Sequence, residues 1–148
     1  DVFLLDAHSL SLCRRFPTCG MVFSVAILEK HVYALSLTET MDTVLTVFTQ
    51  GRSERKIPLP GMPGALCIVP EYIIAATHCG LFFLPHGESS ILSHIAVPGR
   101  AGRLWTLPEG LLMTDLWSEA LFWREKGLRG WRRVSHSIRE ISVLKLFD

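Results

Sequence analysis

A histidine and a cysteine stand side by side in Thr77-His78-Cys79, and these are the residue types that a thiol nucleophile and its general base require. Catalysis also needs the two side chains within hydrogen-bond reach of each other. The residues around them are typical of a β-strand, and neighbouring side chains on a strand point to opposite faces. The sequence therefore predicts that this pair does not form a catalytic dyad.

Two carboxylates, Glu71 and Glu109, each follow a proline where one strand is expected to turn into the next. A solvated charge costs little in such a turn, so we interpret both as turn residues rather than as an acid–base pair. The nearby glycines Gly99 and Gly102 lack the G-x-x-x-x-G-K spacing that cradles phosphates. These patterns predict no enzymatic activity and no small-molecule substrate.

The cysteines are irregularly spaced, without the closely paired C-x-x-C of zinc sites, and no histidine pair lies at zinc-finger spacing. We predict free thiols, buried or half-buried, with no metal and no other cofactor; a disulfide or a metal site is the alternative. Asparagine is absent, so the chain has no N-glycosylation acceptor. Both features favour the cytoplasm or the nucleus. The cysteines are Cys13, Cys19, Cys67 and Cys79.

The segment 123–139 carries six basic residues against a single acidic one, Glu125, and two tryptophans are interleaved with them. Arginine and tryptophan are enriched where proteins bind partners, and arginine matches carboxylate and phosphate geometry. We therefore interpret this segment as a candidate site for a protein or phosphopeptide partner. A solvated outer hairpin with arginine stems packed on tryptophan rings is one alternative, and a nucleic-acid contact is another. The candidate contact residues are Arg124, Lys126, Arg129, Trp131, Arg132 and Arg133.

These residues belong to a chain of 148 residues that is 49% hydrophobic and 20% charged, which is a globular composition. Its net charge of +1 gives no overall attraction to nucleic acid or to a membrane surface. No apolar run approaches the roughly 18 residues that a membrane helix needs. We therefore expect a protein partner, no membrane, and no nucleic acid as the main partner.

The chain repeats itself at an offset of 38 residues. Residues 59–74 (LPGMPGALCIVPEYII) align without a gap to residues 97–112 (VPGRAGRLWTLPEGLL), and a weaker copy precedes them. The shared turn residues are Pro60 and Pro98, Gly61 and Gly99, and Gly64 and Gly102. Self-similarity of this length predicts a repeat architecture.

The apolar runs within each copy, such as 72–76 and 81–84, have the length of strands and are bounded by Gly, Pro and Ser. They are nearly continuous, which indicates strands covered on both faces, as in small stacked sheets. The final run, 138–147, is expected to be a strand, with a short helix as the alternative. The predicted units are a partial one at 1–17, four-stranded ones at 21–60, 64–98 and 102–135, and a partial one at 138–148, all within a single domain 1–148.

Stacking four-stranded blades around an axis buries both faces of each blade, which is the principle of the β-propeller. The fold class that we predict is therefore all-β: an incomplete propeller of about three blades with partial blades at both ends. In this interpretation the chain is a fragment, and we expect it to oligomerise or to be poorly soluble by itself. A closed four-bladed form, in which the first two strands and the last share one blade, and an all-β sandwich are the alternatives.

The repeat length and strand spacing resemble those of WD-repeat propellers over nearly the whole chain. The signature Trp-Asp and Gly-His dipeptides are missing, and no residue is a convincing counterpart of the family's tight-turn aspartate. The resemblance is therefore to a degenerate WD-repeat-like propeller, which implies an interaction scaffold without chemistry of its own.

A narrower resemblance is to the divergent propeller region of mammalian F-box/WD-repeat proteins. The stretches that resemble this region in sequence character are 2–5, 32–48 and 72–84. That family implies a substrate-receptor role in a ubiquitin ligase, with an F-box that recruits the ligase core; these 148 residues contain no F-box helices. The leading hypothesis is thus a protein–protein interaction scaffold, with ubiquitin-ligase substrate recognition as its narrower form. The alternatives are a nucleic-acid-binding module that uses the basic segment 124–139 and, least favoured, a propeller hydrolase with its site in the central channel.

Overall fold

The structure, a computed structural model, describes residues 1–49, 52–86, 88, 90–118 and 120–135. Within these ranges the regular structure is all β-strand, arranged in one two-stranded and three four-stranded antiparallel sheets. The two-stranded sheet pairs β1 (Val2–Leu5) with β2 (Leu12–Phe16). No helix with the length and hydropathy of a membrane span occurs in the described part of the chain.

Each four-stranded sheet is a meander in which strands that follow one another in sequence are hydrogen-bonded neighbours. The first blade consists of β3 (Met21–Leu28), β4 (His31–Leu37), β5 (Thr43–Thr49) and β6 (Arg52–Leu59). The second consists of β7 (Pro63–Ile68), β8 (Tyr72–Thr77), β9 (Gly80–Pro85) and β10 (Ser93–Ile95). The third consists of β11 (Ala101–Leu107), β12 (Gly110–Asp115), β13 (Leu121–Glu125) and β14 (Arg132–Ser135).

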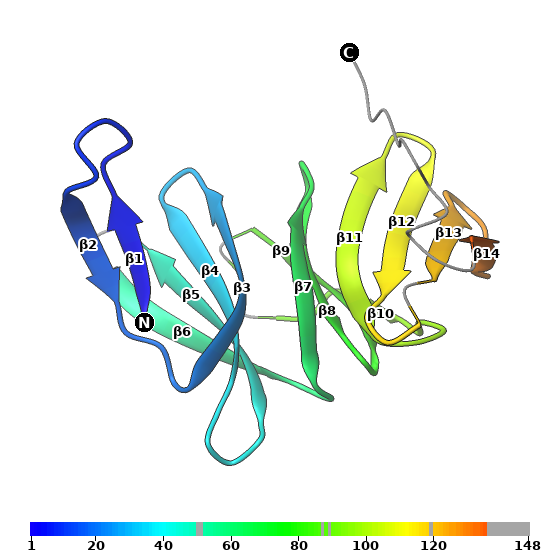
Figure 1. Ribbon diagram of the computed structural model, residues 1–148, viewed down its shortest axis with the longest axis horizontal. Helices are drawn as coiled ribbons and strands as arrows, with labels where there is room; N and C mark the ends of the chain where they lie inside the picture. The colour runs from blue at the N-terminus through cyan, green and yellow to red at the C-terminus, as the bar shows by residue number, and fades with distance from the viewer. Residues whose placement is uncertain (50–51, 87, 89, 119, 136–148) are drawn as a thin grey trace.

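The three blades stand side by side in an open arc, and the two-stranded sheet lies beyond the first of them (Figure 1). The first strand of each blade is its inner strand, because β7 contacts both β3 and β11. Blades that meet through their first strands around a common axis are the arrangement of a β-propeller. The structure therefore confirms the prediction of an all-β, incomplete propeller.

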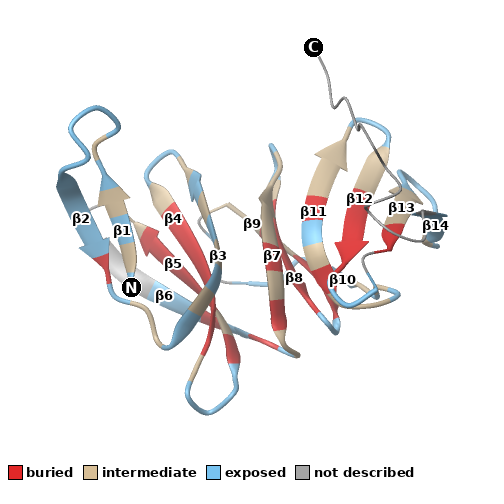
Figure 2. Ribbon diagram, viewed as in Figure 1, coloured by how far each residue is buried: buried red, intermediate tan, exposed pale blue. Residues whose placement is uncertain are grey.

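Three apolar seams hold this arc together, and each lies between two neighbouring sheets. Buried residues are concentrated on the middle strands β4, β5, β8 and β12, as Figure 2 shows. On β8, Ile73 belongs to the seam with the first blade and Ile74 to the seam with the third, and both are at most 1% exposed. A strand buried on both faces requires the nearly continuous apolar run that its sequence has. The seam between the two-stranded sheet and the first blade contains Phe16, Val32, Ala34 and Phe48.

The observed strands can be placed beside the predicted units. Those of the three blades occupy 21–59, 63–95 and 101–135, where the predicted units were 21–60, 64–98 and 102–135. The first two strands lie within the predicted partial blade at 1–17. The partial blade predicted at 138–148 lies outside the described residues, and the grouping of all units into a single domain stays a prediction.

The 38-residue repeat has a physical counterpart in two backbone hydrogen bonds. In the second blade the His78 amide donates to the Met62 carbonyl at 3.0 Å, and in the third blade the Leu116 amide donates to the Arg100 carbonyl at 2.8 Å. Both donor and acceptor are displaced by 38 residues between the two blades. Each bond ties the turn after a blade's second strand to the chain that enters the blade. The recurring prolines and glycines therefore reflect one turn geometry that is used twice.

Asp115 organises this turn in the third blade. Its carboxylate accepts hydrogen bonds from the Arg100 amide at 2.9 Å and from the amide and hydroxyl of Ser118. Gly99 passes so close that a Cβ there would lie 2.6 Å from the Asp115 Oδ1 atom, which explains the glycine. Asp115 is therefore the acceptor that holds this turn, a role that was not expected for it from the sequence. At the equivalent position of the second blade, the hydroxyl of Thr77 donates to the Pro60 carbonyl and accepts from the Cys79 amide.

Replacing Asp115 by alanine is expected to lower the free energy of unfolding by about 2 kcal/mol at pH 7, because three donors lose their acceptor. Burial raises the pKa of Asp115, but hydrogen bonds from Ser118, Arg100 and Trp117 outweigh burial and hold the pKa below its usual value. The ionised carboxylate therefore stabilises the fold above about pH 4, and this contribution is lost as the pH falls through the folded pKa.

Urea unfolding of the wild type and of Asp115→Ala at pH 7 and pH 3 measures both effects. The difference between the two proteins is expected to be smaller at pH 3. Asp42→Ala, which removes an exposed aspartate from a turn of the first blade, is the matched control. An equal loss of stability in the control would contradict the role given to Asp115.

Candidate functional site

A groove of about 600 Å³ lies between the second and third blades, at the strand ends joined by the β7–β8 and β11–β12 turns. One wall comes from the β7–β8 turn with β8 and β9, and the other comes from the β11–β12 turn with the end of β13. We call this feature the inter-blade groove. Its lining includes Glu71, Tyr72, Phe83, Thr106, Arg124 and Lys126.

Aromatic side chains form the wall that the second blade contributes. Tyr72 and Phe83 meet edge to face with ring centroids 5.8 Å apart, beside the fully buried Ile74. The Nε2 atom of His86 lies 2.8 Å from the Val69 carbonyl and so braces the turn that precedes Tyr72. Rigid aromatic rings of this kind are typical anchors at protein interfaces.

Charged side chains line the other wall and the rim. Arg124 is half-buried and lies across from Leu111, on the face of the third blade that packs toward the second. Lys126 is exposed at the rim, and Glu71 and Glu125 are exposed as well. The groove therefore combines an aromatic anchor with charges of both signs, which suits an extended peptide better than a small apolar ligand.

The β13–β14 hairpin divides the basic candidate residues between two faces. Phe122 lies opposite Arg133, whereas Trp123 lies opposite Arg132. Since Phe122 packs in the seam with the second blade, Arg133 shares the groove-side face with Arg124, and Arg132 points to the other face. Arg129 is exposed in the loop between the two strands. The segment is therefore not one continuous basic surface.

Trp131 has a structural role within this hairpin. Its indole Nε1 donates to the Ala96 carbonyl at 2.9 Å, and its half-buried ring packs against the seam between the second and third blades. An indole whose N–H is already bonded inside the fold fastens the outer hairpin to the neighbouring blade. Its sequence neighbours do not indicate this, because the contact joins residues 35 positions apart.

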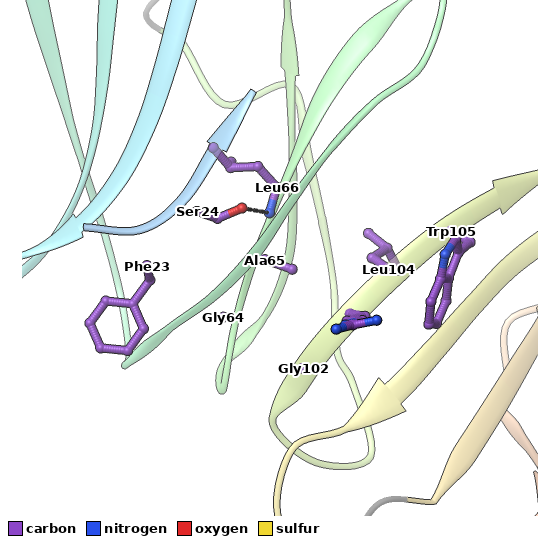
Figure 3. Close-up of a pocket in the computed structure, with 9 residues that line it drawn as sticks. Phe23, Ser24, Gly64, Ala65, Leu66, Gly102, Leu104 and Trp105 are labelled. Carbon is purple, nitrogen blue, oxygen red and sulfur yellow. Dashed lines mark hydrogen bonds between the residues drawn. The ribbon is translucent and has the colours of Figure 1, made fainter. Parts of the chain in front are cut away.

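A second pocket, of about 350 Å³, lies on the inner side of the arc where the first strands of the three blades approach one another (Figure 3). Each of these strands has a register irregularity there, between Val22 and Ser24, Pro63 and Leu66, and Ala101 and Arg103. The Ser24 hydroxyl accepts a hydrogen bond from the Leu66 amide at 3.1 Å, the dashed line in Figure 3, and so links the first two blades. The described lining of this axial pocket contains no Asp, Glu or His.

The histidine and cysteine of Thr77-His78-Cys79 do not lie on a strand, so that expectation was wrong. β8 ends at Thr77 and β9 begins at Gly80, which places His78 and Cys79 in the tight turn between them. Both side chains lie against Gly61, where a Cβ would be 2.7 Å from the Cys79 Sγ and 3.1 Å from the His78 Nδ1. The Nδ1 atom accepts a hydrogen bond from the Met62 amide at 2.7 Å, so it is committed to holding the turn. The absence of an enzymatic activity stays a prediction.

All four cysteines are free thiols, but only two match the expected burial. Cys19 and Cys67 are half-buried, whereas Cys13 and Cys79 are exposed. Burial raises the pKa of the Cys67 thiol, outweighing its hydrogen bonds with Thr106, so this thiol stays protonated and weakly reactive. No three His, Cys, Asp or Glu residues of the described ranges form a group that would hold a metal ion.

The groove-forming residues Tyr72 and Phe83 were not among the candidates from the sequence. Their signal is weak, because aromatic residues on short strands are equally typical of a blade's interior. The position of Tyr72 directly after a repeated Pro-Glu turn is the one feature that distinguishes it. That position places it at a strand end, where the seam between two blades opens to solvent.

Comparison with known proteins gives the fold but no family. No family model matches the chain, and no curated protein matches it. Among solved structures, the β-propeller of YCF48 bound to a D1 peptide is similar, with a TM-score of 0.51 and 18% sequence identity over 76% of this chain. This chain spans 38% of the length of that structure. At this identity the similarity establishes a propeller fold.

Proposed function

We propose that this protein is an interaction scaffold that binds an extended segment of a partner protein in the inter-blade groove. The observation that carries the proposal is the groove itself, in which the Tyr72–Phe83 pair faces the basic side chains Arg124 and Lys126. The similar propeller YCF48 is solved with a peptide bound, which is the same class of ligand. A cytoplasmic or nuclear location is part of this proposal.

The groove can be tested by photo-crosslinking from its rim. A photoreactive amino acid in place of Lys126 is expected to crosslink a partner protein in cells, whereas the same group in place of Arg132 is expected to give no such product. The two positions form a matched pair, because both are exposed on one hairpin and Arg132 lies on the face away from the groove. Equal crosslinking from both positions would contradict the proposal.

Reversing the charge at Lys126 tests how much this residue contributes to the affinity for the partner. Lys126→Glu is expected to weaken binding of the crosslinked partner about tenfold, because a rim charge of the wrong sign slows association. Arg132→Glu is the control and is expected to leave the affinity unchanged. Surface plasmon resonance at two salt concentrations makes the measurement. Equal losses of affinity in Lys126→Glu and Arg132→Glu would contradict binding in the groove.

A narrower form of the proposal is substrate recognition for a ubiquitin ligase. The resemblance of 2–5, 32–48 and 72–84 to the propeller region of F-box/WD-repeat proteins is what supports it. If this form holds, the partner crosslinked at Lys126 is ubiquitinated in cells and accumulates when the protein is depleted. Unchanged ubiquitination would contradict the narrower form and leave the scaffold role standing.

A further inference from the structure

A third cavity lies at the opposite end of the same two blades from the inter-blade groove. It has a volume of about 470 Å³ and is bounded by the chain entering each blade and by the turns after β8 and β12. We call it the turn pocket. The residues that matter for its chemistry are Met62, His78, Pro98, Arg100, Asp115 and Trp117.

The hydrogen-bonding groups left free in the turn pocket are donors. The oxygens of Asp115 are taken up by Arg100 and Ser118 within the fold. His78 uses its Nδ1 as an acceptor for the Met62 amide, which leaves Nε2 as the N–H donor of the neutral ring. Trp117 also lines the pocket, and at 81% exposure it presents its indole N–H as a further donor.

Arg100 adds a guanidinium group whose N–H donors are not all paired. Its Nη2 atom donates to the Pro63 carbonyl at 3.1 Å, and its Nε atom is buried without a partner among the described residues. A guanidinium has five N–H donors, and one left unpaired in the interior is costly. Arg100 also lines the pocket, so a carboxylate there would give the remaining N–H groups of the guanidinium a charged acceptor.

An apolar surface borders these donors. Trp117 is 81% exposed at the tip of the β12–β13 turn, and its neighbour Leu116 is 50% exposed. Met62 and Pro98 line the pocket beside them. An exposed tryptophan next to a cavity is typical of an interface anchor, because tryptophan is among the residues that are enriched at binding hot spots.

From these observations we infer that the turn pocket is a second binding site, which takes a carboxylate carried on an apolar, extended peptide. The carboxylate lies against Arg100 and His78, and a neighbouring apolar side chain covers the ring of Trp117. The site is separate from the inter-blade groove, because the two cavities lie at opposite ends of the strands and share no lining residue. A partner could therefore be held at both ends of one pair of blades.

Three short peptides test the inference by isothermal titration calorimetry with the full 148-residue chain. Acetyl-Pro-Leu-Asp-Leu-amide carries a side-chain carboxylate, acetyl-Pro-Leu-Asn-Leu with a free C-terminus carries a terminal one, and acetyl-Pro-Leu-Asn-Leu-amide carries none. Binding of either carboxylate peptide with a Kd below about 1 mM, and at least about tenfold more tightly than the uncharged peptide, is expected. The peptide that binds identifies the source of the carboxylate, and failure of both carboxylate peptides would overturn the site.

Variants then locate the binding. Trp117→Ala removes an exposed ring and is expected to weaken the better peptide about tenfold or more. Leu128→Ala, an exposed apolar residue in the β13–β14 loop, is the control and is expected to have no effect. Arg100→Gln is expected to abolish the preference for the carboxylate. Because the Arg100 side chain also bonds the Pro63 carbonyl, the melting temperature of this variant is measured first. If Arg100→Gln does not fold, the result for Trp117→Ala tests the inference. Unchanged affinity in Trp117→Ala overturns the inference.

The variant Lys126→Glu distinguishes peptide binding in the turn pocket from binding in the inter-blade groove. The variant is expected to retain full affinity for the carboxylate peptide, because Lys126 lies at the other end of the blades. Peptide binding that disappears in Lys126→Glu and persists in Trp117→Ala would assign the carboxylate to the groove and overturn the turn pocket. Failure of the groove proposal alone would leave the peptide titrations and the Trp117→Ala result unaffected.

Discussion

Gly64→Ala is expected to lower the free energy of unfolding by about 3 kcal/mol, although it adds a single methyl group. Gly64 lies on the inner strand β7, where a Cβ atom would stand 2.2 Å from the Ala101 carbonyl oxygen of β11. The Cβ position is fixed by the backbone of β7 and the carbonyl oxygen belongs to the backbone of β11, so no side-chain rotation can relieve the overlap. The inner strands of the second and third blades would have to separate, and the seam between them would open.

Alanine substitutions at two other glycines serve as controls for the loss of stability in Gly64→Ala. At Gly102, the repeat equivalent of Gly64, the nearest atom to an added Cβ is the Thr114 hydroxyl at 3.0 Å, so Gly102→Ala is expected to cost less. At Gly130 nothing lies within 4 Å, and Gly130→Ala is expected to be nearly neutral. Urea unfolding curves with equal slopes would give the three free energies on one scale. A Gly64→Ala midpoint equal to that of Gly130→Ala would mean that the two inner strands are farther apart than the structure has them.

Much of this architecture can be predicted from the sequence, because the same residue types recur at equivalent turns of the repeat. Pro60 and Gly61 recur as Pro98 and Gly99 since each pair enters a blade beneath a tight turn that leaves no room for a side chain. Short apolar runs between such turns predict strands buried on both faces, and Ile73 with Ile74 shows why. Local chemistry of this kind is visible in one chain without any three-dimensional information.

The candidate sites were less predictable, because they depend on contacts between distant residues. The basic segment looks continuous in sequence, yet strand register sends Arg132 and Arg133 to opposite faces. Trp131 looks like an exposed anchor, yet its indole reaches Ala96 in the preceding blade. Asp115 was missed because its neighbours do not match a WD-repeat signature, although its place 38 residues after Thr77 marks it as the same turn position.

Ile73→Ala and Ile74→Ala are each expected to lower the free energy of unfolding by about 2 to 5 kcal/mol. Both side chains are at most 1% exposed, and each would leave a cavity in an apolar seam. Ile27→Ala is the matched control, because Ile27 is 53% exposed on the inner strand of the first blade. Its expected cost is within about 0.5 kcal/mol of zero.

The two isoleucine variants also test whether the seams open independently of each other, because Ile73 and Ile74 are neighbours in sequence that pack into different interfaces. Ile73 contributes to the seam with β4 and β5, and Ile74 to the seam with β11 and β12. In a repeat fold whose blades contact only their neighbours, a defect in one seam weakens that interface first. Amide hydrogen exchange is therefore expected to accelerate mainly in the first blade for Ile73→Ala and mainly in the third for Ile74→Ala. Identical exchange patterns in the two variants would show that the blades open as one cooperative unit.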